Sequence, residues 1–232
     1  MTSQAGPETA VQRVIAIDGP AGAGKSTVAR MVARQLGFQF LDTGALYRCV
    51  GLSLMRANRL SEPSAWGELA SGLEIRFIEE GTVQRVLLDG EDVTEAIRAP
   101  EVGEAASICS ADPAVRQALL DQQRRIGAIA PTVTEGRDTG TVVFPRACLK
   151  VFLTASAEER ARRRLYDLQQ RGFTASMPDV LAEIAARDAR DSGRTVAPLV
   201  QAPDAVHLHT DGMTIEQVTA EVIRLWTTRN CV

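Results

Sequence analysis

Eight consecutive residues near the start of the sequence constrain its fold more than any other feature. Residues 19–26 are Gly-Pro-Ala-Gly-Ala-Gly-Lys-Ser, which matches the pattern G-x-x-x-x-G-K-[ST]. The β-branched apolar run 14–17 precedes this segment, and a stripe of apolar residues at helical spacing follows it until Gly37. A simple glycine-rich turn does not require that context, whereas a phosphate-binding P-loop does. We therefore expect a buried strand, a P-loop and a helix in succession.

The residue types in this loop suit the binding of ATP with Mg²⁺. Glycines let backbone N–H groups curve around phosphates, and the following helix directs its positive end toward them. We expect Lys25 to reach the β and γ phosphates and the Ser26 hydroxyl to ligate Mg²⁺. Among the 26 basic residues only Lys25 and Lys150 are lysines, which favours a specific need for lysine at position 25. The predicted ATP-binding residues are Gly19, Pro20, Ala21, Gly22, Ala23, Gly24, Lys25, Ser26 and Thr27.

Further apolar runs predict the rest of the sheet. Candidate strands follow at 38–41, 132–135, 149–153 and 205–209, and Thr214 with Gln217 gives a capping-box signal for a last helix. Five buried strands that alternate with helices indicate an α/β fold with a parallel, doubly wound sheet. Such sheets bind ligands at the carboxyl ends of their strands, where this sequence places polar residues. These are Asp18, Asp42, the segment 135–138, Thr154 and Asp211.

The stretch 73–93 interrupts the alternation of strands and helices. Residues 74–78 alternate polar and apolar side chains, residues 79–82 form a turn signal, and an apolar run follows at 83–88. This pattern predicts a hairpin in an inserted lobe. Residues 86–89 imitate an apolar strand that ends in a catalytic Asp, but their hairpin context argues against a core strand.

Composition excludes several classes of function. A formal net charge of −3 argues against a nucleic-acid-binding protein that relies on bulk electrostatics. No segment has the length and apolarity of a signal peptide or a membrane span, so we expect a cytoplasmic protein without a membrane partner. The spacing of the cysteines does not suit zinc, and we expect reduced core thiols at Cys49, Cys109, Cys148 and Cys231. His207 and His209 are expected to be sheet residues.

Two arginine clusters narrow the choice among P-loop proteins. The base-reading motif N-K-x-D and the switch motif D-x-x-G of GTPases are absent from the sequence, and no Asp-Glu pair of a motor ATPase ends a core strand. Spacings of i, i+3, i+4 and i+7 place Arg187, Arg190, Asp191 and Arg194 on one helix face, which suits a second anionic substrate or, alternatively, a solvated face with i,i+4 pairs. The second cluster, Arg160, Arg163, Arg164 and Arg171, suits a polyphosphate or RNA. The residues alone indicate a P-loop kinase of a small phosphorylated or hydroxylated substrate.

Four segments give the sequence a specific resemblance. Residues 17–27, 41–48, 136–145 and 187–194, the last followed by Ala-Pro-Leu at 197–199, resemble the motifs of bacterial cytidylate kinases. The similarity extends from about residue 14 to residue 219. It implies a single P-loop domain of the nucleoside monophosphate (NMP) kinase fold, with core segments at about 12–42, 117–154 and 195–232. An NMP-binding lobe at about 43–116, containing the hairpin 73–93, and a short lid at about 155–175 complete this fold.

The resemblance also implies roles for individual residues. Lys25, Arg137 and Arg194 would be catalytic. Arg48, Arg137 and Arg194 would bind the phosphate of CMP, while Arg187 and Asp191 would hold its ribose. Ser107, Arg116 and Asp138 would face the cytosine. Thr43 stands where relatives often carry Ser, and Glu135 where some carry Asp.

The implied activity is transfer of the γ-phosphoryl group of ATP to CMP and dCMP by a monomer, without a covalent enzyme intermediate. Two alternatives stay open at this stage. One is a kinase with another acceptor, such as UMP or the non-nucleotide shikimate. The other is a regulatory protein that binds a nucleotide without turning it over.

Overall fold

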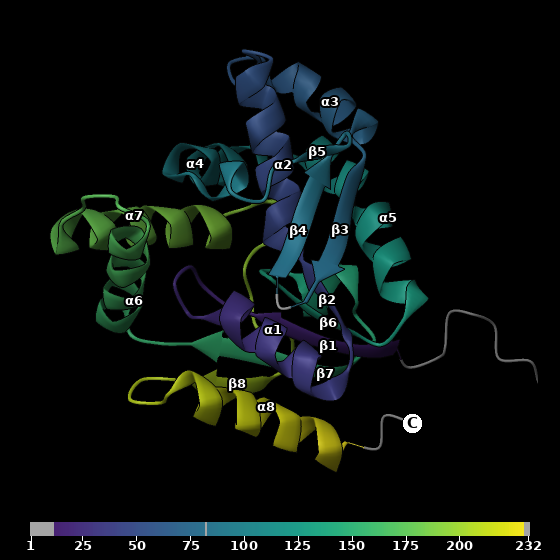
Figure 1. Cartoon of the computed structure of the whole chain (residues 1–232), viewed down its shortest axis with the longest axis vertical. Helices are drawn as coiled ribbons and strands as arrows, with labels where there is room; N and C mark the ends of the chain where they lie inside the picture. The colour runs from purple at the N-terminus through teal and green to yellow at the C-terminus, as the bar shows by residue number, and fades with distance from the viewer. Residues whose placement is uncertain (1–11, 82, 230–232) are drawn as a thin grey trace, which may run out of the picture. The chain divides into compact units, whose positions relative to one another are not determined.

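The computed structural model describes residues 12–81 and 83–229 (Figure 1). The chain divides into two compact units, which are described separately. The first unit comprises Met1–Leu41 and Ile126–Val232, and the second comprises Asp42–Arg125. Helix α5 (Pro113–Ile129) contains the later of the two boundaries between the units.

The first unit is built on a five-stranded sheet with the strand order β2-β6-β1-β7-β8 (Figure 1). Strand β1 pairs in parallel with β6 and β7, and β7 pairs in parallel with β8. This arrangement confirms the predicted α/β class with a doubly wound sheet. The bounds of the strands are β1 Gln12–Asp18, β2 Gln39–Asp42, β6 Thr132–Gly136, β7 Ala147–Thr154 and β8 Val206–His209.

Two helices pack on the apolar side chains of this sheet. Helix α1 (Lys25–Leu36) and helix α8 (Ile215–Thr228) share one core cluster with β1, β6 and β7. Gly37 ends α1 in the left-handed conformation, with its N–H bonded to the last carbonyls, as glycine at this position commonly does. The capping box predicted for α8 is present, with reciprocal bonds between Thr214 and Gln217. Local sequence signals thus set the ends of both helices.

A helical pair lies between β7 and β8 in the sequence. Helices α6 (Ala157–Gln170) and α7 (Met177–Ser192) begin at serine caps and pack on each other through a small apolar cluster of their own. This apolar cluster consists of Ala161, Leu168, Val180 and Ile184. Helix α7 ends at Ser192, so Arg194 lies beyond the helix on which its spacing had placed it.

The second unit contains the predicted hairpin. Strands β3 (Ile75–Glu80) and β4 (Val83–Leu88) pair antiparallel, and the short β5 (Glu91–Asp92) adds to β4. The run 86–89 therefore belongs to a hairpin, as predicted, and is not a strand of the parallel sheet. The helices of this unit are α2 Thr43–Arg56, α3 Trp66–Gly72, α4 Pro100–Cys109 and most of α5, with single 3₁₀ turns at Pro63–Ala65 and Ala96–Arg98.

The cysteines depart from expectation at one position. Cys49 and Cys109 are buried free thiols, as predicted. Cys148 is disulfide-bonded, so the prediction of reduced thiols is wrong there, and Cys231 lies outside the described residues. Within the described parts of the chain, every helix is too short or too polar to cross a bilayer.

Candidate active site

The P-loop lies between β1 and α1, where the sequence predicted it. Gly19 has a φ of 152°, and a side chain there would begin 2.0 Å from the carbonyl oxygen of Leu153 on β7. Gly22 has a φ of 75°, and a Cβ atom there would lie 3.0 Å from the carbonyl oxygen of Arg160. These two glycines are required because the loop is pressed against β7 and α6 at positions where only glycine fits without strain.

Lys25 is the first residue of α1, and the loop covers it almost completely. The residue is 5% exposed, and its Nζ donates to the carbonyl oxygen of Pro20 at 2.8 Å. Burial and the nearby guanidinium of Arg137 lower the pKa of Lys25 to about 7, against a partial opposite effect of Glu135. The amine thus sits in a site that disfavours an unbalanced positive charge, and an anionic ligand would restore the balance.

Ser26 makes a contact that the sequence analysis did not anticipate. Its hydroxyl donates to Oε1 of Glu135 at 2.8 Å, and Glu135 is a buried residue of β6. The two residues are 109 positions apart, so spacing alone could not join them. The signal in the sequence that could have indicated this contact was the polar residue Glu135 at the end of the predicted core strand 132–135. By contrast, Thr27, which follows Ser26 in α1 and was also predicted to bind ATP, is exposed.

Three charged side chains form a buried cluster between the β6 end and the α7 end. Asp191 is 1% exposed, and its carboxylate accepts from Arg137 Nε at 2.7 Å and from Arg194 Nη2. Burial alone would raise the pKa of Asp191, but Arg137 and Arg194 outweigh this effect and lower it. The solvated-face alternative for this helix is therefore wrong at Asp191. Its partners are two largely buried arginines, one of them from a distant part of the chain.

Asp18 connects the end of the P-loop strand to the segment that carries Arg137 and Asp138. Its Oδ1 accepts from the N–H and the hydroxyl of Thr139 at 2.9 and 2.8 Å, and its Oδ2 accepts from the Gly140 N–H at 2.7 Å. Thr139 begins the π-helical turn Thr139–Val143. Burial raises the pKa of Asp18 despite these bonds. Asp138 is also buried and precedes the turn.

Helix α7 also reaches the P-loop through Asp188. The Asp188 carboxylate accepts from the Ala21 N–H at 3.3 Å and from Arg160 Nη1 at 2.6 Å. Arg187, the preceding residue, lies near enough to Lys25 to contribute to its lowered pKa. Neighbouring residues of one helix thus face both the P-loop and its lysine.

The second unit holds the other predicted substrate-binding residues. Thr43 and Ser107 are buried, and the Ser107 hydroxyl has no hydrogen-bond partner among the described residues. Arg48 donates from Nη1 to the carbonyl oxygen of Ile97 at 2.9 Å. Arg116 donates from Nη1 to the carbonyl oxygen of Ser110 at 3.2 Å and lies over the ring of Tyr47. A buried hydroxyl without a partner is uncommon and is consistent with a ligand that would supply one.

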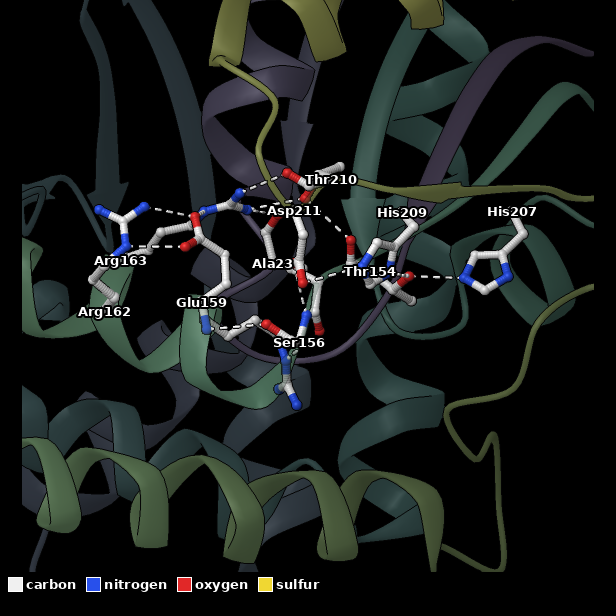
Figure 2. Close-up of polar contacts among 12 residues, drawn as sticks. Ala23, Thr154, Ser156, Glu159, Arg162, Arg163, His207, His209, Thr210 and Asp211 are labelled. Atoms are coloured by element: carbon white, nitrogen blue, oxygen red, sulfur yellow. Dashed lines mark hydrogen bonds and ion pairs between the residues drawn. The ribbon is translucent and has the colours of Figure 1, made fainter.

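His207 and His209 lie on β8, as predicted, and contact the end of β7 (Figure 2). Nε2 of His207 lies 2.7 Å from Oγ1 of Thr154, and Nε2 of His209 lies 3.2 Å from Oδ2 of Asp211. Asp211 in turn accepts from the Ser156 N–H at the start of α6. This network ties the carboxyl ends of β7 and β8 together.

A P-loop at the carboxyl end of the central strand of a parallel sheet, with a buried lysine and converging arginines, defines the class of P-loop phosphotransferases. Comparison with known proteins gives the family. The family model for cytidylate kinase matches residues 15–228. The chain therefore belongs to the cytidylate kinase family.

Individual relatives agree with this family membership. A cytidylate kinase from Citrifermentans bemidjiense is 50% identical over 206 residues, which cover 88% of each chain. A cytidylate kinase from Pseudomonas putida is 48% identical over 212 residues, or 90% of this chain and 93% of that protein. A solved structure of shikimate kinase from Bacteroides thetaiotaomicron is a more distant likeness, with a TM-score of 0.44 and 15% identity over 93% of this chain and 97% of that chain.

Proposed function

We propose that this chain transfers the γ-phosphoryl group of ATP to CMP and dCMP, giving ADP with CDP or dCDP, in pyrimidine nucleotide metabolism. Membership of the cytidylate kinase family supports the reaction class and both substrates. The observation in the structure that carries the proposal is the buried cluster of Arg137, Asp191 and Arg194, which shares a unit with the P-loop. Arg137 lies near enough to Lys25 to lower the pKa of that amine, so the cluster adjoins the lysine that would hold the donor phosphates.

The donor would be held by the P-loop, residues 19–27, with Lys25 on the phosphates. The contact of Lys25 with Pro20 would have to break for its amine to reach a phosphate oxygen. We expect the exchange of a carbonyl for a phosphate to be favourable, because burial and Arg137 lower the pKa of Lys25 and an anionic phosphate would favour its charged form.

Mg²⁺ is implied by the phosphotransfer chemistry, and the residues present fit it. Ser26 and Glu135 offer a hydroxyl and a carboxylate 2.8 Å apart, which are the oxygen donors that Mg²⁺ prefers. Mg²⁺ sites in such enzymes use few protein ligands together with phosphates and water, so this pair is sufficient. When bound there, the ion would neutralise charge on the phosphates; Ser26 and Glu135 would hold it.

The acceptor would be bound through its phosphate, ribose and base. We assign the phosphate to Arg48, Arg137 and Arg194, and the ribose to Arg187 and Asp191. We assign the cytosine and its surroundings to Thr43, Ser107, Arg116 and Asp138. The described structure supports these assignments by the burial of Asp191 and Asp138 and by the unpaired hydroxyl of Ser107.

The chain's own residues would promote transfer by position and charge. Arg137 and Arg194 would align the attacking oxygen of the CMP phosphate, and Lys25 would offset the charge that develops on the transferred group. No nucleophilic side chain is needed between donor and acceptor, so we propose direct in-line transfer. Exclusion of water by the lid, predicted at about 155–175, would prevent hydrolysis.

Turnover coupled to ADP detection with a panel of acceptors tests this function. CMP and dCMP should be phosphorylated well, with UMP slower and shikimate inactive. Efficient use of shikimate or the absence of turnover with every acceptor would contradict the proposal; the second result would favour a regulatory nucleotide-binding protein. We also propose that the protein is a cytoplasmic monomer, which light scattering and fractionation of cells would check.

A further inference from the structure

We infer that Arg160 and Arg163 are positioning residues of the P-loop, which hold two of its peptide groups so that the next N–H groups face the phosphates. This inference takes from the proposed function only that the P-loop binds a triphosphate. It assigns to these arginines a different role from that of lid residues that close over ATP. Two hydrogen bonds from α6 to P-loop carbonyl groups support this role.

Arg163 is fixed on three sides by the protein itself (Figure 2). Its Nε donates to Oε1 of Glu159 at 2.7 Å, and its Nη1 donates to the carbonyl oxygen of Ala23 at 3.3 Å. Nη1 and Nη2 also donate to Oγ1 and the carbonyl oxygen of Thr210, both at 3.0 Å. A guanidinium has five N–H donors, and these four contacts engage most of them. Protein groups alone therefore hold Arg163 in place.

Arg160 makes the equivalent contact two residues earlier in the loop. Its Nη1 donates to the carbonyl oxygen of Ala21 at 2.9 Å and to Oδ2 of Asp188 at 2.6 Å, and its Nε donates to the carbonyl oxygen of Ala155 at 3.2 Å. Asp188 accepts from the Ala21 N–H with its other oxygen. Arg160 and Asp188 thus hold both polar groups of Ala21.

The geometry of the peptide bond gives these contacts their consequence. In a trans peptide the C=O of one residue and the N–H of the next point in opposite directions, and the described residues contain no cis peptide. Binding of the Ala21 carbonyl therefore orients the Gly22 N–H, and binding of the Ala23 carbonyl orients the Gly24 N–H. Gly22 and Gly24 have φ values of 75° and 88°. Such left-handed residues make N–H groups converge into an anion-binding nest.

Without the arginines these two peptide groups could rotate whenever no ligand occupies the loop. Glycine has no side chain to oppose such a rotation, and a turned peptide would present a carbonyl oxygen to the phosphates. Each charge-assisted hydrogen bond from a guanidinium to a carbonyl opposes this flip. Arg160 and Arg163 would thereby keep the loop ready to bind a triphosphate.

The neighbouring Arg162 provides a matched control. It lies on the same helix and pairs with the same Glu159, at 2.7 Å, but its side chain is 67% exposed and makes no described contact with the P-loop (Figure 2). Arg162→Ala removes the same charge from α6 and leaves the loop carbonyls untouched. A general electrostatic effect of α6 would affect both variants alike.

The test uses the full chain without acceptor, so it does not depend on whether CMP is the substrate. Calorimetry would give the Kd of ATP, GTP and inorganic tripolyphosphate for Arg160→Ala, Arg163→Ala and Arg162→Ala. We expect Arg163→Ala and Arg160→Ala to weaken all three ligands by similar factors, on the order of tenfold or more, and Arg162→Ala to change them less than about twofold. In the ligand-free protein, NMR should show shifted or exchange-broadened amide signals of Gly24 in Arg163→Ala and of Gly22 in Arg160→Ala.

Two results would overturn the inference. Retention of tripolyphosphate affinity with loss of ATP affinity would mean that the arginines contact the nucleoside directly. Unchanged Gly22 and Gly24 amide signals would mean that the loop keeps its conformation without them. Arg163→Lys and Arg160→Lys cover the case of poor folding: one ammonium can restore a single carbonyl contact, so these variants should recover part of the lost affinity for all three ligands.

Discussion

Arginine and carboxylate side chains pair in both units, but in very different surroundings. On the three-stranded sheet of the second unit, Arg85 pairs with Glu80 and Asp92, and all three side chains are between 42% and 51% exposed. In the first unit, the side chains of Asp191 and Arg194 are 1% and 5% exposed. Exposed pairs of this kind contribute about 0–1 kcal/mol each to stability. Removal of one partner from a buried pair costs about 3–5 kcal/mol, because it leaves an unpaired charge in the interior.

This difference in burial indicates which of the two regions has a role beyond folding. Folding alone gives little reason to bury an ion pair, because apolar residues of similar volume stabilise a fold as well or better. The arginines of the buried cluster are largely removed from water, whereas Arg85 of the hairpin remains about half exposed. An anionic ligand would give these buried arginines a function, and the experiments below test that explanation, beginning with the variant expected to change activity most.

Lys25→Ala should have the largest effect on activity. Loss of the point charge next to the transferred phosphoryl group should lower turnover by several orders of magnitude. The fold should persist, because the buried amine is poorly supported without a ligand, as its pKa of about 7 indicates. Steady-state kinetics and a thermal melt measure the two effects. More than a tenth of the original rate in the variant would contradict the role of Lys25.

Arg194→Ala compared with Arg85→Ala tests the two arginine environments directly. Arg194→Ala should raise the KM for CMP by about tenfold to a hundredfold and lower turnover, with little change in the KM for ATP, because a charge-assisted contact with the acceptor is lost. Arg85→Ala should leave the kinetics unchanged and lower Tm by a few degrees at most. Equal kinetic behaviour of the two variants would return the buried cluster to a purely structural role.

Asp138→Ala should weaken the preference for cytosine. On the proposed assignment, the Asp138 carboxylate accepts from the exocyclic amino group of CMP and would lose that donor with UMP, which costs on the order of 1–3 kcal/mol. We therefore expect kcat/KM for CMP to exceed that for UMP by roughly tenfold to a hundredfold in the unmodified protein, and the ratio to fall in the variant. Equal use of CMP and UMP by the unmodified protein would argue against this assignment.

The lowered pKa of Lys25 predicts proton uptake when ATP binds. The ligand-free pKa is about 7 against an ordinary value of 10.5, and phosphates should raise it again. At about pH 8 the complex should therefore take up a fraction of a proton, which calorimetry in two buffers of different ionisation enthalpy would measure. Lys25→Met should abolish the uptake attributable to this amine. Equal uptake by that variant would show that another group titrates.

The same shift has a defined sign for stability. Between about pH 7 and 10.5 the unfolded chain binds more protons at Lys25 than the folded chain does, so this residue makes the free energy of unfolding rise with pH over that range. Denaturant titrations of the ligand-free protein and of Lys25→Met at pH 7 and pH 9 would show the difference. A smaller gain for the unmodified protein than for the variant would contradict the shift.

The local parts of the fold and the site could be predicted because their signals are contiguous. The P-loop, the five strands and the capping box of α8 each follow from residues within a few positions of one another. The contacts of Ser26 with Glu135 and of Arg137 with Asp191 could not, because they join residues 109 and 54 positions apart without a periodic pattern. The paired-arginine pattern was also ambiguous in sequence, since spacing does not report burial.

Resemblance to a family supplied most of the remaining assignments. It pointed to Ser107 and Arg116, which no physical signal in the sequence distinguished from other helix residues. It did not point to Asp188 or Arg160 as contacts of the P-loop, because a motif gives residue types and the contact depends on how α6 and α7 pack. These contacts are visible only in the three-dimensional structure.

The close approach of Gly19 to β7 bears on how this protein can evolve. At position 19 even a methyl group would overlap the Leu153 carbonyl, which belongs to a central strand that cannot withdraw. At position 24 the nearest atom to an added methyl group is the end of the Arg163 side chain at 3.7 Å, so only the backbone conformation opposes a substitution. Substitution of Gly19, the first glycine of the motif, is therefore excluded by steric overlap, whereas substitution of Gly24, the last, only strains the backbone. Two positions that the motif writes with the same letter are therefore constrained by different physical causes.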